Sequence, residues 1–528
     1  MVPDPTLEPM PGPMTEPTPA PVVPAAGGRR RSSLHVMAGF GGTSVVLAVQ
    51  TLLLVPLFVE RIGARLYGAW LGSGDVLAWL PVADLGMGDV LLQRVAASHA
   101  AGDRRDVAEW VATGWRVMLA VAVVVGLVGA AGAVVLPGVL GLAGSEARAL
   151  TQAFAVAAAA MSVQVLFSGG FAYARAVQRA GALSAANTAA FAAGFAVSLV
   201  WVLLAGGLAA IAAGFAARAA VQLASVSVFL RREGVLSDPE ARFSPDKLRD
   251  LLAVTPLTAL STVAFLAMSQ SEFFLVALLL GPETSVLYMV NRKAVDLARA
   301  FADSVVWGTY GAFAHLAGSD PDGVALRRYR EILVLRTVLA VALAGAYIAV
   351  NASFVSVWVG PEFVLGPWLS VAVGVQAVVT GNAFLVNYLY RAAGCVREGA
   401  WLLTAESVVR VGLVVALVRS VGVIGVPLAG IATAAVALAV THRRLVAHFL
   451  RRGAAEERVE ARFWAVCAVV LALCTAAGLW GGVARWSYVL AGGGASFAVA
   501  LALTGASTAL FAGYRQAARA RLRAFLDR

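Results

Sequence analysis

The densest group of ionisable residues in this chain lies within one thirteen-residue segment. Only 13% of the 528 residues are charged and 60% are hydrophobic. Positions 291–303 nevertheless read NRKAVDLARAFAD, with three cations and two anions. These five residues are Arg292, Lys293, Asp296, Arg299 and Asp303. All except the lysine recur at intervals of three or four positions, so on a helix they share one face.

Two cation–carboxylate pairs are spaced one helical turn apart in this segment. Arg292 precedes Asp296 and Arg299 precedes Asp303 by four residues, a spacing that lets opposite charges pair. Lys293 is left over, so the face carries a net positive charge. Because a guanidinium offers a planar fork of donors that matches phosphate, we predict that this face is one wall of a site for a phosphate-bearing substrate.

Other ionisable residues inside apolar segments extend this candidate site. The predicted substrate-binding cations are Arg218, Arg292, Lys293, Arg299 and Arg410. The predicted acids of the same lumen, or of coupling to an ion, are Asp75, Asp84, Glu272, Asp296 and Asp303. A buried carboxylate can bind and release a proton when its surroundings disfavour the charged form. The alternative is that these charges form structural salt bridges between the two halves of the protein.

The sequence contains no motif for a metal, a cofactor or a nucleotide. The five histidines are scattered without metal-ligand spacing, and the three cysteines do not suggest a disulfide framework. The P-loop motif requires a lysine directly after a glycine, and neither of the two lysines in this chain follows a glycine. We therefore predict no catalytic residue, no metal and no cofactor. The net charge of +11 is better explained by orientation in a membrane than by binding to nucleic acid.

Long apolar segments must position these residues. The mean hydropathy is +0.81, and the apolar runs are long enough to cross a hydrocarbon core of ~30 Å as helices. The predicted fold class is an all-α polytopic membrane protein with about 14 transmembrane helices. The predicted spans are 36–60, 67–92, 113–141, 151–174, 183–206, 208–230, 251–280, 285–314, 333–358, 364–390, 400–418, 421–441, 463–481 and 487–511.

Basic residues indicate how these spans are oriented. Most of the 41 lysines and arginines fall in alternate loops, and Arg116 and Arg336 are assigned to these loops. Such asymmetry predicts that the basic loops and both termini are cytoplasmic. The segment 291–303 could instead be a solvated helix outside the membrane. The number of crossings would then be odd, and every later loop would change sides, so we favour a membrane-embedded segment facing a cavity.

The first twelve spans form two related sets of six. RVMLAVA from Arg116 matches RTVLAVA from Arg336, and RAGA from Arg179 matches REGA from Arg397. An even number of spans gives both sets the same orientation, so their pseudo-two-fold axis follows the membrane normal. The predicted domains are a disordered Pro-rich cytoplasmic tail (1–35), an N-terminal six-helix lobe (36–230), a cytoplasmic linker (231–250), a C-terminal six-helix lobe (251–446), a cytoplasmic loop (447–462), two extra helices (463–511) and a basic cytoplasmic tail (512–528).

Short motifs in both sets resemble those of a known transporter family. They are YGAW at 67–70, DLG at 84–86 with Arg94 beyond it, and QSE at 270–272 with GP at 281–282. With the order of spans, they resemble the Wzx-type polysaccharide flippases of the multidrug/oligosaccharidyl-lipid/polysaccharide exporter superfamily. The resemblance covers roughly 36–446 in span order, and its motifs are short and degenerate.

The resemblance implies a function for the predicted site. Two six-helix lobes would alternate access and flip an undecaprenyl-diphosphate-linked oligosaccharide from the cytoplasmic to the outer leaflet of the bacterial inner membrane. Lumen cations would meet the diphosphate, and a proton or sodium gradient would drive transport. Contact with polysaccharide biosynthesis proteins is also implied. Asp84 falls in the DLG motif, and Glu272 takes an acidic position of the seventh span where an aspartate is more usual.

Two other functions compete with flipping of a lipid-linked sugar. A drug or cation antiporter of the same superfamily would use an acidic lumen for cationic cargo, whereas the cations of 291–303 favour an anion. A membrane glycosyltransferase or polysaccharide polymerase would need a sizeable outer loop to hold its acceptor. The predicted outer loops are short, so we predict a transporter rather than an enzyme.

Overall fold

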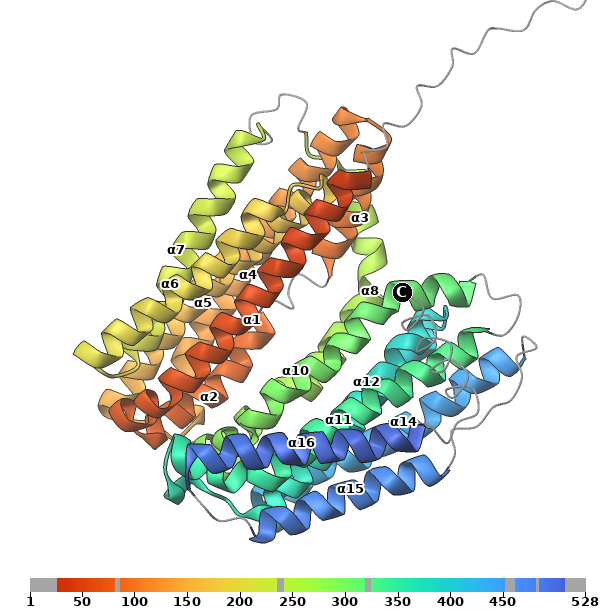
Figure 1. Cartoon of the computed structure of the whole chain (residues 1–528). Helices are drawn as coiled ribbons and strands as arrows, with labels where there is room; N and C mark the ends of the chain where they lie inside the picture. The colour runs from red at the N-terminus through yellow and green to blue at the C-terminus, as the bar shows by residue number, and fades with distance from the viewer. Residues whose placement is uncertain are drawn as a thin grey trace, which may run out of the picture.

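The computed structural model describes residues 26–80, 86–234, 242–318, 324–451, 461–480 and 484–508. Within these residues the regular elements are helices, and they form two groups (Figure 1). The N-terminal bundle contains α1 (Ala26–Ile62), α2 (Ala64–Trp79), α3 (Met87–Ala100), α4 (Arg104–Val139), α5 (Gly144–Ala176), α6 (Gly181–Leu204) and α7 (Ala209–Arg232).

The C-terminal bundle follows a break in the described chain. It contains α8 (Pro245–Ser269), α9 (Glu272–Leu280), α10 (Pro282–Gly318), α11 (Val324–Trp358), η2 (Pro361–Phe363), α12 (Pro367–Ala392), α13 (Val396–Val421), η3 (Gly422–Ile424), α14 (Gly425–Leu450), α15 (Ala461–Trp480) and α16 (Trp486–Thr508). The last two helices pack mainly on α11, on the outside of this bundle (Figure 1).

The described helices confirm an all-α protein that spans a membrane several times. Ten helical stretches are long and apolar enough to cross a bilayer, and an eleventh qualifies if α8 and α9 count as one bent span. One of these stretches, Val396–Leu450, holds both α13 and α14. The predicted spans 67–92 and 285–314 fall short, because α2 and α3 are separate short helices and α10 carries the charged segment.

Two predicted spans are broken rather than continuous. The span 67–92 ends as α2 at Trp79 and resumes as α3 after Gly86, whose φ of 81° is left-handed. The span 251–280 bends by 47° between α8 and α9. The long apolar segments on either side of each break led us to predict single spans.

Side chains of α2 satisfy free backbone groups at the break between α8 and α9. Trp79 donates its indole N–H to the carbonyl of Gln270 at 2.9 Å, where α8 has ended. The Asp75 carboxylate accepts the N–H of Phe274 at 3.0 Å, in the first turn of α9. Helix ends leave such groups without intrahelical partners, and the membrane interior offers no water to replace them. The side chains of α2 therefore stabilise the break in the opposite bundle.

The two bundles meet closely where α2 crosses α9 and α10. A Cβ at Gly68 would lie 1.8 Å from the carbonyl oxygen of Pro282, and a Cβ at Gly72 would lie 2.9 Å from the Cβ of Ala277. Glycine is required at Gly68, because a methyl group would collide with backbone. From this end the bundles diverge, and α8 runs between them (Figure 1).

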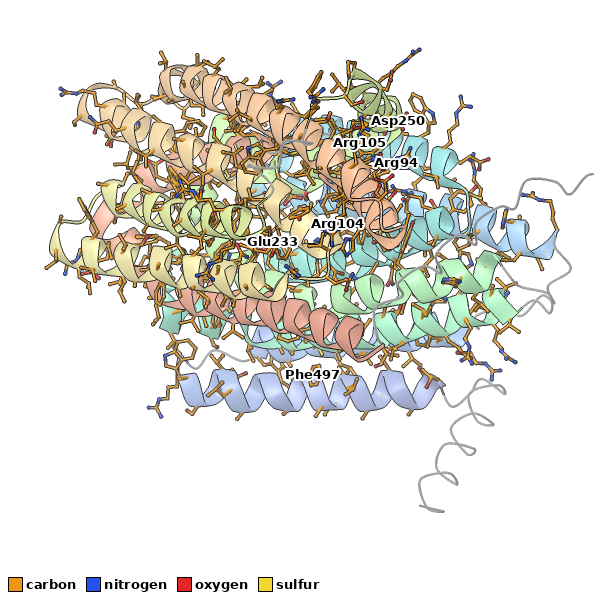
Figure 2. The ribbon with its side chains drawn as sticks, turned by 90° about the horizontal axis from the view of Figure 1, so that it is seen from above. Arg94, Arg104, Arg105, Glu233, Asp250 and Phe497 are labelled. Atoms are coloured by element: carbon orange, nitrogen blue, oxygen red, sulfur yellow. The ribbon has the colours of Figure 1, made fainter. Side chains whose placement is uncertain are left out.

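At the opposite end, polar contacts hold the start of α8 against the N-terminal bundle. Ser244 caps α8 by accepting the N–H of Lys247 at 3.4 Å. The Lys247 ammonium lies 2.6 Å from Asp106 and 3.0 Å from Glu109, both on α4. A second and more exposed pair joins α3 to α8, with the Arg94 guanidinium 3.3 Å from Asp250 (Figure 2). The start of α8 is thus tied to the other bundle by charge.

The predicted domain limits stay predictions, although the helices give their local structure. Helix α1 begins at Ala26, within the segment 1–35 that we predict to be disordered. Helix α14 continues to Leu450. The tail 512–528 lies outside the described residues.

Candidate functional site

A polar cavity of about 340 Å³ lies inside the C-terminal bundle, between α8, α9, α10, α12 and α13. Six of the predicted site residues line it. They are Glu272 of α9, Arg292, Asp296, Arg299 and Asp303 of α10, and Arg410 of α13. The structure therefore brings together residues that are up to 138 positions apart in the chain.

Glu272 is the centre of the inner part of this cavity. Its Oε1 accepts a hydrogen bond from Arg410 Nη2 at 2.6 Å, and its Oε2 accepts one from Arg292 Nη1. Gln376 and Tyr288 add donors at 3.4 and 3.1 Å. The carboxylate is only 5% exposed, so its charge is balanced by the two guanidinium groups rather than by water.

The bend before α9 puts Glu272 in this position. Glu272 is the first residue of α9, directly after the break at Gln270 and Ser271. A carboxylate in the first turn of a helix is favoured by the free N–H groups there. The break thus turns the start of α9 into the cavity and presents an acid at its wall.

The two pairs expected from the spacing on α10 are formed. Arg292 donates hydrogen bonds from Nε and Nη2 to the two carboxylate oxygens of Asp296, at 2.9 and 3.0 Å. Arg299 donates Nε to Asp303 at 3.1 Å. The Arg299 side chain is 33% exposed and that of Arg292 only 14%. Arg299 is therefore the more accessible arginine of the α10 face.

A fourth arginine, which the sequence assigned to a cytoplasmic loop, stands behind this cavity. Arg336 lies within α11 and is 0% exposed. Its Nη2 donates to Asp303 at 2.8 Å and its Nη1 to Asn382 at 2.7 Å. The assignment was wrong because α11 starts at Val324, well before the apolar run begins. Thr380 and Asn382, two polar residues within the apolar span 364–390, were the available signal.

Small residues leave room for these large side chains. A Cβ at Gly381 would lie 1.5 Å from Arg336 Nη2, and one at Gly430 would lie 2.5 Å from Gln376 and 3.1 Å from Arg410. The guanidinium groups thus occupy space next to the helix axes of α12 and α14. Larger residues there would displace the network.

The charge balance of the cavity differs from the prediction. Three arginines and three carboxylates line it, and Arg336 adds one cation behind the wall. The cationic wall expected from 291–303 is therefore largely compensated by carboxylates, chiefly by Glu272 from α9. Lys293, which was to make the wall positive, is half-buried on α10 and does not line this cavity.

The remaining predicted residues lie elsewhere. Asp75 is 5% exposed and caps α9 from the opposite bundle. Arg218 lies on α7, in a separate pocket of the N-terminal bundle. Asp84 lies outside the described residues. Asp75 and Arg218 thus lie apart from the six residues that line the polar cavity.

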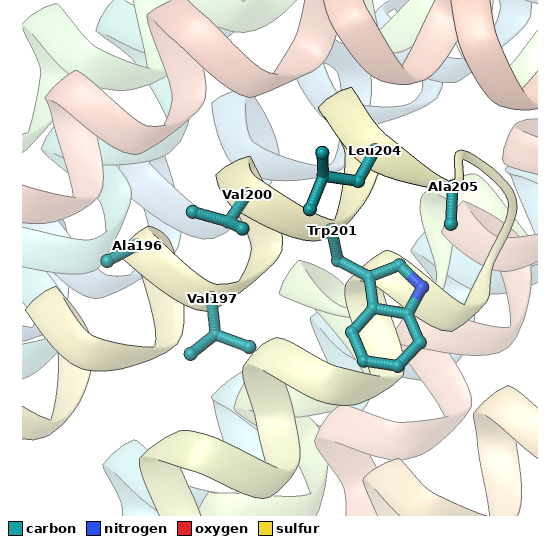
Figure 3. A pocket seen from close by; sticks show the side chains of 6 residues that line it. All are labelled: Ala196, Val197, Val200, Trp201, Leu204 and Ala205. Carbon is teal, nitrogen blue, oxygen red and sulfur yellow. The ribbon is translucent and has the colours of Figure 1, made fainter.

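A larger hollow on α6 is unsuited to a charged group. It has a volume of about 440 Å³ and is lined by apolar side chains alone (Figure 3). Its residues are Ala196, Val197, Val200, Trp201, Leu204 and Ala205. Because a buried polar group without a partner is costly, this hollow is a poor site for a charged substrate group, and the polar cavity is the candidate site.

Sequence comparison identifies neither a family nor a curated relative. No family model matches the chain, and no curated protein matches it.

Solved structures do match in three dimensions. A multidrug resistance MATE family transporter of the MOP superfamily, in its inward-facing conformation, has a TM-score of 0.61 and 17% identity. That match covers 77% of this chain and 96% of the other. An outward-facing structure of such a transporter gives 0.53 at 17% identity, covering 80% and 96%.

A second kind of transporter matches over a larger share of the chain. The lipid II flippase MurJ, in an inward closed conformation, has a TM-score of 0.65 and 9% identity, and the match covers 90% of this chain and 98% of the flippase. At these identities the likeness concerns the fold. The chain therefore has the fold shared by MATE transporters and the flippase MurJ, and it covers nearly the full length of both.

Proposed function

We propose that this protein is a secondary transporter that flips an undecaprenyl-diphosphate-linked oligosaccharide from the cytoplasmic to the outer leaflet of a bacterial inner membrane. It would act by alternating access in the export of cell-surface polysaccharide. The observation that carries this proposal is the arginine-lined cavity of the C-terminal bundle, and above all the accessible Arg299.

The network around Asp303 suits an arginine that exchanges partners. Asp303 accepts hydrogen bonds from both Arg299 and Arg336. If Arg299 turned toward a phosphate, Asp303 would keep Arg336 as its counter-charge. The exchange would then leave no carboxylate unpaired, which is the condition for moving a charge inside a membrane at low cost. A guanidinium freed in this way matches the oxygens of a diphosphate.

The fold supports alternating access as the means of transport. The bundles touch tightly where α2 meets α9 and α10 and diverge toward the other end (Figure 1). Of the two MATE conformations compared above, the inward-facing one has the higher TM-score, 0.61 against 0.53. The lipid II flippase among the structural neighbours acts on a lipid-linked substrate by its name. Coupling to a proton or sodium gradient, cytoplasmic termini and contact with polysaccharide biosynthesis proteins belong to the same proposal.

A drug or cation antiporter is the second candidate, and one observation favours it. Glu272, Asp296 and Asp303 line the cavity in the same number as the arginines, so a cationic cargo could replace an arginine at a carboxylate. The neighbours named as multidrug transporters share this fold. The two candidates predict opposite sensitivities to loss of an arginine.

Replacement of Arg299 by alanine separates these candidates. A hydrogen bond to a charged group contributes about 1.5–3 kcal/mol, so we expect export of surface glycan to fall about ten- to a hundredfold. Lipid-linked oligosaccharide should accumulate on the cytoplasmic leaflet. The double variant with Arg410→Ala should abolish export at unchanged protein level.

The matched control is Arg105→Ala, since Arg105 has a 76% exposed side chain paired with Glu109 on α4. It should leave export intact. Full export by the Arg299→Ala/Arg410→Ala protein would overturn the flippase proposal. Cationic dye efflux by the wild type that persists or rises in Arg299→Ala, with surface glycan unchanged, would establish the antiporter instead.

A further inference from the structure

A second pocket with a charged wall lies in the N-terminal bundle, between α1, α6 and α7. Its volume is about 190 Å³. Gln50, Ser198 and Arg218 are the side chains in its lining that can form hydrogen bonds, and the rest of the lining is apolar or glycine. It shares no residue with the cavity of the C-terminal bundle.

Arg218 is held in this pocket by aromatic rings. Its guanidinium carbon lies 4.7 Å from the ring centre of Phe191 and 5.0 Å from that of Phe215. Two faces of π-electron density fix the plane of the guanidinium and attract its charge. Neither ring can accept a strong hydrogen bond from it.

The charge of Arg218 has no protein counter-ion in the part of the chain that the structure describes. No described carboxylate lies within ion-pair distance of its guanidinium, and its Nε is buried without a hydrogen-bond partner. By contrast, Arg292, Arg299 and Arg336 each contact a carboxylate. An isolated charge within a membrane is costly, and such residues usually face a cavity or a partner.

Close packing of α6 on α7 creates the space for this side chain. A Cβ at Gly194 would lie 2.8 Å from the carbonyl oxygen of Gly214 and 3.3 Å from the Cβ of Arg218. A Cβ at Gly214 would lie 2.0 Å from the hydroxyl of Ser198. The two glycines let the helix backbones touch, so Arg218 emerges into the pocket beside the Ser198 hydroxyl.

We propose that this pocket binds a phosphate group, for which Arg218 supplies the counter-charge and Ser198 and Gln50 supply flanking hydrogen bonds. The volume is below the roughly 300–1,000 Å³ of ordinary ligand pockets, so it takes a headgroup rather than an oligosaccharide. Leu47, which lines the pocket, is 41% exposed, so the pocket reaches the protein surface. The phosphate comes either from an anionic phospholipid or from inorganic phosphate in solution. This site is independent of the cargo cavity.

The test compares the full-length wild-type protein with Arg218→Met in lipid nanodiscs of phosphatidylglycerol or of digalactosyldiacylglycerol, a bilayer lipid that carries no phosphate. Phosphatidylglycerol should raise the melting temperature of the wild type and leave that of the variant unchanged. Native mass spectrometry should show one retained phosphatidylglycerol on the wild type, with retention reduced at least about tenfold in the variant. Arg105→Met on the exposed face of α4 is the control and should behave as the wild type.

A detergent experiment identifies the source of the phosphate. Inorganic phosphate is compared with chloride at equal ionic strength, without added lipid. Stabilisation of the wild type by inorganic phosphate, and not of Arg218→Met, would support binding of the free ion. Stabilisation by phosphatidylglycerol alone would support the lipid.

The proposal is overturned if wild type and Arg218→Met respond equally to phosphatidylglycerol and to phosphate. Failure of the flippase proposal would leave both outcomes unaffected, because neither readout involves transport.

Discussion

The two bundles stabilise their membrane-embedded arginines in different ways. In the C-terminal bundle, four arginines pair with three carboxylates in two groups. Glu272 joins Arg292 and Arg410, with Asp296 also on Arg292, and Asp303 joins Arg299 and Arg336. In the N-terminal bundle, Arg218 lies between two phenylalanine rings, and no described carboxylate reaches it. The C-terminal bundle thus balances most of its own charge with carboxylates, whereas aromatic rings are the described contacts of Arg218 in the N-terminal bundle.

Matching positions of the sequence repeat place their arginines in different surroundings in the two bundles. Arg116 and Arg336 begin matching segments. Arg336 is fully buried in the network. Arg116 is exposed on α4, with its guanidinium 5.6 Å from the ring centre of Phe243. Related backbones therefore accommodate quite different charge arrangements.

The largest expected effect comes from Asp303→Asn. This change leaves Arg299 and the fully buried Arg336 without their shared carboxylate. Breaking a buried pair costs about 3–5 kcal/mol, so the free energy of unfolding in detergent should fall by that amount. Arg218→Met in the other bundle should cause no comparable loss.

A double variant sharpens this contrast. Adding Arg336→Met to Asp303→Asn removes the stranded charge and should recover a large part of the lost stability. Exposed ion pairs contribute up to about 1 kcal/mol to the free energy of unfolding. If Asp303→Asn alone lowers that free energy by less than this, the ion pairs of Asp303 are not buried in the membrane. The contrast between the two bundles would then be lost.

A smaller loss is expected from Gly381→Ala. The added methyl carbon would lie 1.5 Å from Arg336 Nη2, so the guanidinium must move away from Asp303. Overpacking of this kind costs about 1–3 kcal/mol. Thermal unfolding measures the loss of stability.

The control for this variant is Gly412→Ala on α13, where a Cβ would meet nothing within 4 Å. Alanine should be tolerated there or should stabilise the helix by up to about 1 kcal/mol. Equal effects of the two substitutions would mean that Arg336 repacks freely, and that the network tolerates rearrangement.

The smallest effect concerns the boundary between the bundles. Lys247→Met removes two ion pairs that hold the start of α8 on α4. A partly exposed pair contributes up to about 1 kcal/mol, so hydrogen exchange of the α8 amides near Lys247 should speed up about fivefold. Arg94→Met, in the more exposed pair with Asp250, should have less effect. Faster exchange in Arg94→Met than in Lys247→Met would show that the Arg94–Asp250 pair, rather than Lys247, holds the start of α8 on the N-terminal bundle.

Much of the architecture follows from composition and spacing. Each predicted span corresponds to a helix or to two successive helices, since apolar length determines where a chain can cross a bilayer. The pairs of α10 follow from helical periodicity, because residues four apart on one helix are neighbours whatever surrounds them. Interactions within one helix were therefore predictable.

Interactions between helices were not. The break before Glu272 depends on Trp79 and Asp75 of another bundle. The charge of Arg410 is balanced by Glu272, and this ion pair depends on where the break places Glu272. Arg336 looked like a loop residue because its partners are Asp303 and Asn382, which no local pattern links to it. Long-range contacts decided each of these, and hydropathy does not report them.

The charged face of α10 also bears on how the chain is made. On biological insertion scales a charged residue at the centre of a span costs about 2.5–3.5 kcal/mol, and a leucine returns only about 0.3–0.6 kcal/mol. Helix α10 carries five ionisable residues between positions 292 and 303, so on its own it would be released to the aqueous side during synthesis. On these scales we expect it to enter the bilayer jointly with its apolar neighbours, α9 directly ahead of it and α11 behind it. Joint entry of neighbouring helices would then be a requirement that the charged face of α10 places on membrane insertion.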